Sequence, residues 1–294
     1  MTRLLDHRAN DRLSRTLALA KNLPPLSPMV RHLLATLYTS GENTSLSQVA
    51  IWVEKDALTA GKVLALANSA YYGRTEPVLT VRCAVSRLGL DAIRNLVVSM
   101  AMGGYWNRIP MPPEWSSSRF NAHAIGTAVL SEMIAAALSP EDVQAAFLAG
   151  LFHDIGHVVI ALALRDNPDA LKRLAVLEHP QLEQVEVELV GFSHAELSAA
   201  MVRSWNLPPL IENAVRFHEE PIDAERTKSG SVALSDILYI ADRYVDYEGL
   251  TISSGARKPK PDHLELIRQL DLGINDSIIF RRFHDELDIL LSIL

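Results

Sequence analysis

The most apolar stretch of the chain runs from Ala145 to Leu164 and carries three polar side chains near its middle, His153, Asp154 and His157. As a helix it would be about long enough to cross a bilayer. A carboxylate and two imidazoles at the centre of a membrane would be costly, so we expect no membrane span. We expect instead a helix in a protein core, where these buried polar groups need partners.

Composition and charge narrow the class of protein. The chain has 294 residues, 48% of them hydrophobic, which is enough to bury a core in one large or two ordinary domains. The formal net charge of -7 offers no general attraction to nucleic acid or anionic lipid. Residues 1–10 lack the apolar run of a signal peptide, and one cysteine, Cys83, excludes an internal disulfide. We expect a cytoplasmic protein in which Cys83 is a small buried hydrophobe.

Helical periodicity dominates the sequence, as at Val30, Leu33, Leu34 and Leu37, and strand-like alternation is scarce. This pattern predicts an all-α fold. In the second half we expect helices near residues 120–138, 140–164, 168–177, 181–190, 193–205, 209–217 and 231–247.

Two breaks in the pattern predict the domain organisation. Gly103-Gly104 and the proline-rich run from Pro110 to Pro113 interrupt the helices. We therefore expect a two-lobed helical bundle with lobes at residues 1–110 and 111–252. Residues 253–294 would form a linker followed by C-terminal helices.

The segment Ala84–Val98 has the form of two helices joined at Gly89, which raises the alternative of a helix-turn-helix that reads DNA. Its second helix carries Ile93, Leu96 and Val97 on what looks like a core face. Together with the negative net charge of the chain, this makes a nucleic-acid-binding regulator the weakest of our hypotheses.

The residues that indicate metal binding or catalysis are histidines and aspartates in apolar helical surroundings. They are His123, His153, Asp154, His194, His218 and Asp242. Such a set, spread over a helical bundle, can hold one or two divalent metal ions between facing helices, with Fe, Mn, Mg and Zn as candidates. Alternatively, the His153-Asp154 pair caps and bonds backbone inside the core.

This ordered set resembles the HD superfamily of metal phosphohydrolases, and the resemblance assigns the metal ligands to His123, His153, Asp154 and Asp242. His194 and His218 match histidines of members that bind a second metal. The upstream half is similar to the HDOD branch over four segments: Leu23–Pro28, Asp56–Leu58, Leu66–Gly73 and Arg87–Leu90. The resemblance covers about residues 20 to 250 and implies an HD-like second lobe.

The HDOD resemblance implies a bacterial signal-transduction output or scaffold module that binds a protein partner or a nucleotide, through the groove between its lobes, without turnover. The rival hypothesis is a metal-dependent phosphohydrolase acting on a nucleotide or cyclic dinucleotide. The HD-GYP branch, which cleaves cyclic di-GMP, has lysine where this chain has His157, and a Gly-Tyr-Pro that is missing after His218. We therefore expect no cyclic di-GMP hydrolysis.

Two smaller features leave alternatives open. His157 lies four residues after His153, a spacing that would put both on one helix face and allow zinc chelation, although a structural or supporting role is favoured. Tyr71 and Tyr72 would either line a contact surface or pack inward where a helix ends at Gly73.

Overall fold

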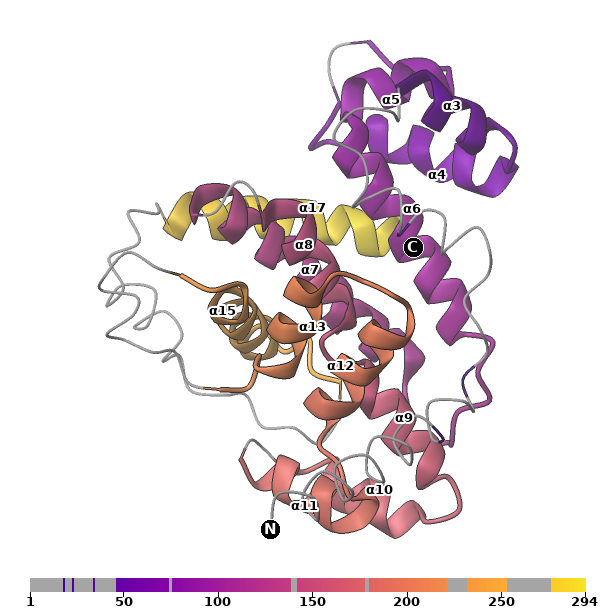
Figure 1. The fold of residues 1–294 in the computed structure, drawn as a ribbon. Coiled ribbons are helices and arrows are strands. Elements are labelled where there is room, and N and C mark those ends of the chain that lie inside the picture. The colour runs from indigo at the N-terminus through magenta and orange to yellow at the C-terminus, as the bar shows by residue number, and fades with distance from the viewer. Residues whose placement is uncertain are drawn as a thin grey trace. The chain divides into compact units, whose positions relative to one another are not determined.

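The computed structural model describes residues 46–73, 76–138, 142–177, 180–220, 232–252 and 276–294, with Ala18, Leu23 and Leu34 as isolated positions. Within these residues the regular secondary structure is entirely helical, which confirms the predicted all-α class (Figure 1). The chain divides into two compact units. We call the described residues of Leu26–Arg108 and Asn275–Leu294 the N-terminal unit, and those of Ile109–Ile274 the central unit.

The N-terminal unit joins four consecutive helices to the last helix of the chain. These are α3 (Leu46–Glu54), α4 (Ala57–Ala67), α5 (Val81–Leu88), α6 (Leu90–Trp106) and α17 (Asp276–Ile293). Helix α4 begins where the Asp56 carboxylate accepts a hydrogen bond from the Thr59 amide at 3.0 Å. The side chain of Asn68, the C-cap residue that follows this helix, bonds both backbone groups of Val78, at 2.7 and 2.8 Å, and so fixes the loop between them.

Helices α5 and α6 meet at Gly89, whose φ of 82° lies in the region that favours glycine. Ile93 and Leu96 on α6 are fully buried, as expected for core packing.

Two details of the N-terminal unit differ from prediction. Helix α6 continues through Gly103-Gly104, because the buried Tyr105 and Trp106 anchor its last turn and glycine weakens a helix without forbidding it. Cys83 is exposed, because it lies on the solvent side of the first turn of α5.

The two adjacent tyrosines contact the C-terminal helix of their own unit. Tyr72 donates a hydrogen bond from its hydroxyl to Glu286 at 3.2 Å, and Arg282 donates to the Tyr71 hydroxyl at 3.2 Å. Burial raises the pKa of the Glu286 carboxyl, although the hydrogen bond from Tyr72 and the charge of Arg282 oppose this shift. These contacts tie α17 to the segment that follows α4.

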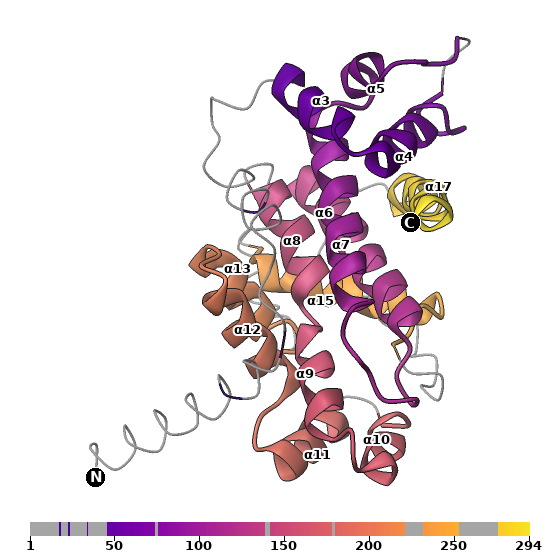
Figure 2. The same ribbon diagram turned by 90° about the vertical axis from the view of Figure 1, so that its right-hand side faces the viewer.

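The central unit contains eight described helices. They are α7 (Ser117–Leu138), α8 (Val143–Phe152), α9 (Ile155–Ala163), α10 (Pro168–Leu174), α11 (Gln181–Val190), α12 (His194–Ser204), α13 (Pro209–Arg216) and α15 (Leu234–Tyr247). Helix α7 packs along α8 and α15, while α12 packs against α9 and α13 (Figure 2). The apolar segment Val143–Ala163 passes a length and composition test for a membrane span, but 89% of its most apolar window is buried inside the protein. It is a core element, as predicted.

We predicted one helix over residues 140–164, and that prediction is wrong at one point. Helix α8 ends at Phe152 and α9 begins at Ile155, with His153 and Asp154 in the turn between them. Asp154 leaves helical geometry, with φ −104° and ψ 11°. The break turns the two side chains toward one point, although neighbours in a continuous helix diverge by about 100°.

Two glycines flank this turn and let other helices approach closely. A Cβ on Gly150 would lie 2.5 Å from the Cα of Ala128 on α7, and one on Gly156 would lie 2.0 Å from the carbonyl oxygen of His194. The Gly156 amide donates to the Ser198 hydroxyl at 2.8 Å. Both glycines are therefore required by packing around the polar cluster.

Candidate metal centre

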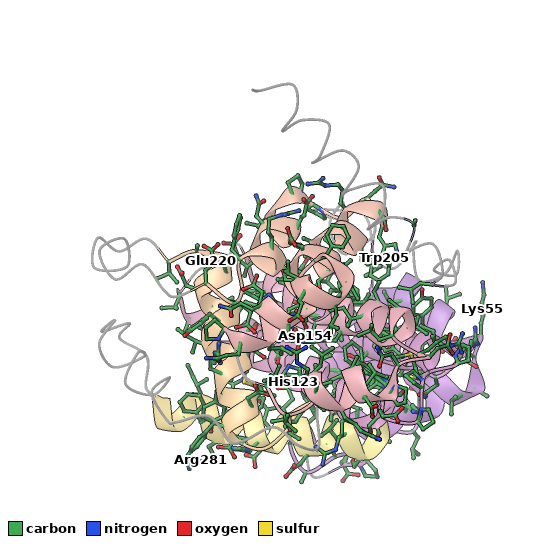
Figure 3. The ribbon with its side chains drawn as sticks, turned by 90° about the horizontal axis from the view of Figure 1, so that it is seen from below. Lys55, His123, Asp154, Trp205, Glu220 and Arg281 are labelled. Atoms are coloured by element: carbon green, nitrogen blue, oxygen red, sulfur yellow. The ribbon has the colours of Figure 1, made fainter. Side chains whose placement is uncertain are left out.

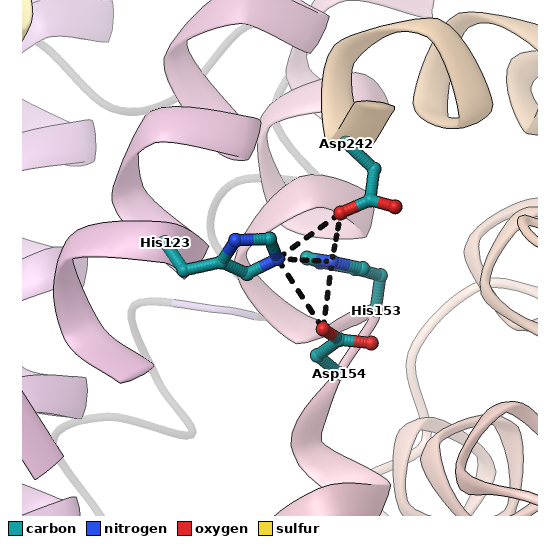
Figure 4. Close-up of side chains that lie close together, drawn as sticks. All are labelled: His123, His153, Asp154 and Asp242. Carbon is teal, nitrogen blue, oxygen red and sulfur yellow. Dashed lines mark hydrogen bonds and ion pairs between the residues drawn. The ribbon is translucent and has the colours of Figure 1, made fainter. Parts of the chain in front are cut away.

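The first candidate site joins four side chains that the sequence predicted together. His123 comes from α7, His153 and Asp154 from the α8–α9 turn, and Asp242 from α15 (Figure 4). The Nε2 atoms of His123 and His153 are 3.1 Å apart, and the Oδ1 of Asp242 lies 3.1 and 3.3 Å from them. The Oδ2 of Asp154 lies 3.3 Å from both imidazoles. All four side chains are at least 90% buried.

Main-chain carbonyl groups fix the orientation of three histidines. Each Nδ1 contacts a carbonyl oxygen: His123 that of Leu250 at 2.8 Å, His153 that of Gly150 at 2.7 Å, and His218 that of Val215 at 2.7 Å. A carbonyl only accepts hydrogen bonds, so each Nδ1 must carry the proton and donate it. The Nε2 of each ring then presents a lone pair to the cluster whenever the imidazole is neutral.

This orientation has an electrostatic consequence for His123 and His153. Two neutral imidazoles would direct their Nε2 lone pairs at each other across 3.1 Å, with carboxylate oxygens on both sides. That arrangement is repulsive unless a proton or a metal cation lies among the four groups. The donor set therefore fits a cation.

The second candidate site lies on the other oxygen of Asp154. Its Oδ1 is 3.4 Å from the Nε2 of His218, 3.6 Å from that of His194 and 3.8 Å from that of His157. A Glu219 oxygen lies 3.6 Å from the Nε2 of His194. The Nε2 atoms of His194 and His218 are buried and have no hydrogen-bond partner. Figure 3 shows Asp154 and His123 at the centre of the surrounding helices.

His157 lies with the second site. The group that could share a cation with it contains Asp154 and His194, whereas His153 belongs to the other group. The predicted common helix face of His153 and His157 is not formed, because the helix breaks between them.

Four charged side chains around the cluster were missed in the sequence: Glu186, Glu219, Arg243 and Asp246. Glu186 is fully buried on α11, and its two oxygens contact the Nδ1 atoms of His194 at 2.8 Å and His157 at 3.1 Å. One signal was present, because Glu186 falls at helical spacing with the apolar Leu182 and Val185. Arg243 donates to Glu219 at 2.8 Å, and both lie beside Asp242.

The pKa shifts of these groups indicate that the cluster stabilises bound positive charge, whether protons or a metal cation. Burial opposes the imidazolium form of His153, yet Asp154 and Asp242 outweigh burial and raise its pKa to about 9. Burial likewise disfavours the charged Asp242 carboxylate, but His123 and His153 hold its pKa well below the ordinary value. Burial and the neighbouring Asp242 raise the pKa of Asp246 to about 7. Without a metal, the imidazoles would take up protons instead.

The donors match particular metals. Two imidazole nitrogens and two carboxylate oxygens suit Mn²⁺, Fe²⁺ or Zn²⁺ better than Mg²⁺, which prefers oxygen ligands and retains water. In each group of candidate ligands, the donor atoms lie within 4.8 Å of one another. The residues present therefore fit a divalent transition metal.

A pocket of about 180 Å³ opens beside the cluster, entirely within the central unit. Its polar end holds His123, Asp154, His157, Glu219, Asp242, Arg243 and Asp246. Its other walls are largely apolar and include Trp115, Ile160, Ala161, Leu171, Leu174, Leu177 and Leu182. Among the described lining residues, Arg243 is the one lysine or arginine. The pocket gives a small molecule access to the candidate metal centre.

We predict that metal-free protein becomes less stable as the pH rises from about 6 to 9. The raised pKa of His153 stabilises the folded state fully below its unfolded value near 6.5, and this contribution is lost as the pH passes 9. The raised pKa of Asp246 also lowers the stability of the folded state as the pH rises to about 7. Asp154 and Asp242 make no difference to this trend, because both are ionised in the folded and unfolded states throughout the range. The expected loss is on the order of 2 kcal/mol.

Urea unfolding in chelator at pH 6, 7.5 and 9 measures this loss. Added Mn²⁺ should stabilise the protein more at pH 9 than at pH 6, because imidazoles bind metal in their neutral form. A metal-free protein that gains stability between pH 6 and 9 would contradict the raised pKa of His153 in the folded state.

A family model described as HDOD domain matches residues 23–221. An uncharacterized protein of Treponema pallidum (strain Nichols) is 26% identical over 177 residues, which is 60% of this chain but only 34% of that relative. The chain thus matches about a third of the length of that relative.

Solved structures share the fold. A Shewanella amazonensis SB2B protein named "Putative phosphohydrolase" has a TM-score of 0.68 at 23% identity, covering 95% of this chain and 98% of that one. A Marinobacter aquaeolei VT8 protein named "Putative signal transduction protein" has a TM-score of 0.61 at 22% identity, covering 92% and 58% of the two chains. The family model matches well over half of the sequence, and the chain belongs to the HDOD domain family.

Proposed function

We propose that this HDOD protein is a signalling module whose central, HD-like unit binds a divalent cation and, at that cation, a phosphate-containing ligand such as a nucleotide. The cation would be held by His123, His153, Asp154 and Asp242. The observation that carries the proposal is the fixed orientation of the imidazoles, whose Nδ1 atoms face carbonyls while their Nε2 atoms face carboxylates 3.1 to 3.3 Å away. A purely structural core would not need two such lone pairs directed at each other.

When bound, the cation would polarise a phosphate oxygen and offset its negative charge. The chain supplies the remaining groups at the polar end of the pocket. Arg243 brings a fixed positive charge, which Glu219 orients through a 2.8 Å hydrogen bond. The apolar walls formed by residues such as Ile160 and Leu171 suit the uncharged part of the ligand, for example a base.

In the favoured form of this function, the ligand is bound and sensed rather than cleaved, and the module acts on a protein partner in bacterial signal transduction. The HDOD family supports this form, as does the signal-transduction name of one structural neighbour. A reducing cytoplasm suits the exposed free thiol of Cys83. Nothing in the charge balance favours nucleic acid as the partner.

A metal-dependent phosphohydrolase is the second candidate. It is favoured by one observation, namely that three of the four candidate ligands, His123, Asp154 and Asp242, line an accessible pocket. Cyclic di-GMP is a poor candidate substrate, because His157 stands in place of a lysine and the Gly-Tyr-Pro loop is missing after His218. Turnover of a phosphodiester needs the leaving group oriented as well as the cation held.

The test is metal analysis of protein purified without chelator, paired with nucleotide binding and an activity screen. We expect at least one divalent ion per chain and metal-dependent binding of a nucleotide by calorimetry. We also expect no turnover of cyclic di-GMP above that of a His153→Ala, Asp154→Ala double variant, with Mn²⁺, Fe²⁺ or Mg²⁺ supplied. Saturable cleavage well above that control would make the phosphohydrolase the leading function. Protein that binds no divalent ion at all would contradict both candidates.

A further inference from the structure

We propose that His157 is a direct ligand of a second divalent cation, shared with Asp154 and His194 beside the Nε2 of His218, and that the buried Glu186 positions it. The inference rests on the proposed function, because Asp154 belongs to both sites. It concerns residues that the HD-type ligand pattern leaves without a metal role: the histidine at the lysine position and a glutamate on another helix.

The Nε2 atoms of three histidines lie close to one carboxylate oxygen. Those of His157, His194 and His218 all lie within 3.8 Å of the Oδ1 of Asp154, while its Oδ2 faces the first site. Three nitrogens from α9, α12 and the segment after α13 thus converge on one carboxylate oxygen. Imidazole nitrogens and carboxylate oxygens are ordinary ligands of Zn²⁺, Fe²⁺ and Mn²⁺.

Two of these nitrogens have unsatisfied bonding capacity. The Nε2 atoms of His194 and His218 are buried, with 1% of each residue exposed, and neither has a hydrogen-bond partner. The Nδ1 of His218 must donate to the Val215 carbonyl, so its Nε2 presents a lone pair when the ring is neutral. A cation beside Asp154 would satisfy both nitrogens.

Glu186 contacts two of these histidines. Each of its oxygens contacts the Nδ1 of a different histidine, His194 at 2.8 Å and His157 at 3.1 Å, and the His194 amide donates to it at 2.8 Å. The two rings stack with centroids 4.1 Å apart and planes at 16°. The Glu186 carboxylate bonds the Nδ1 of His194, and its negative charge beside the Nδ1 of His157 favours a proton there too, which leaves both Nε2 atoms free to bind metal. A fully buried glutamate is otherwise costly.

The test counts metal ions in the chain of 294 residues. Protein loaded with Mn²⁺ and desalted should retain two ions per chain, while His157→Phe and Asp242→Asn should each retain one. Phenylalanine keeps a ring that stacks on His194 but removes both nitrogens. Glu186→Gln, which keeps the size of the side chain, should weaken the second binding event by 10- to 100-fold in calorimetry. The matched control is His284→Phe in the N-terminal unit, which should retain two ions.

Electron paramagnetic resonance provides a readout that does not depend on activity. Two Mn²⁺ ions that share the Asp154 carboxylate should be magnetically coupled and give a broad, weak signal. His157→Phe should restore the six-line signal of an isolated ion. Circular dichroism confirms folding, and His157→Gln replaces His157→Phe if that variant does not fold.

The outcomes separate the two proposals. Wild-type protein that retains no Mn²⁺ would contradict the proposed function itself. One retained ion that Asp242→Asn removes and His157→Phe leaves unchanged would uphold the proposed function and overturn this inference. Two ions that His157→Phe leaves in place would also overturn it.

Discussion

Asp154→Asn is expected to abolish retention of divalent metal and to lower the melting temperature of metal-loaded protein by about 10 °C. Among the residues that the structure describes, Asp154 is the one carboxylate in contact with both candidate sites, through Oδ2 and Oδ1. A cation at about 1,000 times its dissociation constant stabilises the folded state by about 4 kcal/mol. For a chain of this size, each kcal/mol corresponds to roughly 2 to 4 °C.

Chelator separates the metal contribution from the loss of ion pairs. In its presence the variant should still be less stable than wild type, by about 1 to 3 kcal/mol, because buried imidazoles lose a charged partner. Asp166→Asn, at an exposed position of the same unit, is the matched control and should change neither metal content nor melting temperature. Identical wild-type melting curves with and without chelator would mean that the cluster is stabilised by protons alone.

Gly156→Ala is expected to be the most destabilising single substitution near the cluster, at about 4 kcal/mol or more. The added Cβ would lie 2.0 Å from the His194 carbonyl oxygen and 2.8 Å from the Cα of that residue. Both are main-chain atoms that no rotamer change can move, so α9 and α12 must separate. That separation displaces His194 and breaks the hydrogen bond from Gly156 to Ser198.

Urea unfolding measures this effect, and Gly104→Ala supplies the control. A Cβ at Gly104 meets nothing within 4 Å, and the residue lies inside α6, so alanine should stabilise the protein by about 0.5 to 1 kcal/mol. A Gly156→Ala variant as stable as wild type would show that the two helices can part at little cost.

The sequence predicted the helical class because apolar spacing and local turn chemistry act over a few residues. Gly89 illustrates this, since its φ of 82° ends one helix and starts the next where expected. The break at His153-Asp154 was not predicted, because its cause is tertiary. The two side chains turn toward His123 and Asp242, which come from other helices.

The candidate site was predictable only in part, for a similar reason. His123, His194 and His218 stand out because imidazoles are unusual on apolar faces. Glu186 does not stand out, because glutamates are common on helices and its burial depends on α9 and α12 rather than on α11 alone. Its place on the Leu182–Val185 stripe was the one local sign.

The hydrogen bonds from Nδ1 to carbonyl oxygens also bear on how such a protein can change over evolutionary time. His123, His153 and His218 take their orientation from backbone groups of Leu250, Gly150 and Val215, and backbone groups are present whatever side chain occupies those positions. Substituting one ligand therefore leaves the other imidazoles aimed at the same point. A lineage built on this fold can lose a ligand, and with it turnover, while the remaining geometry persists and is open to reuse for binding.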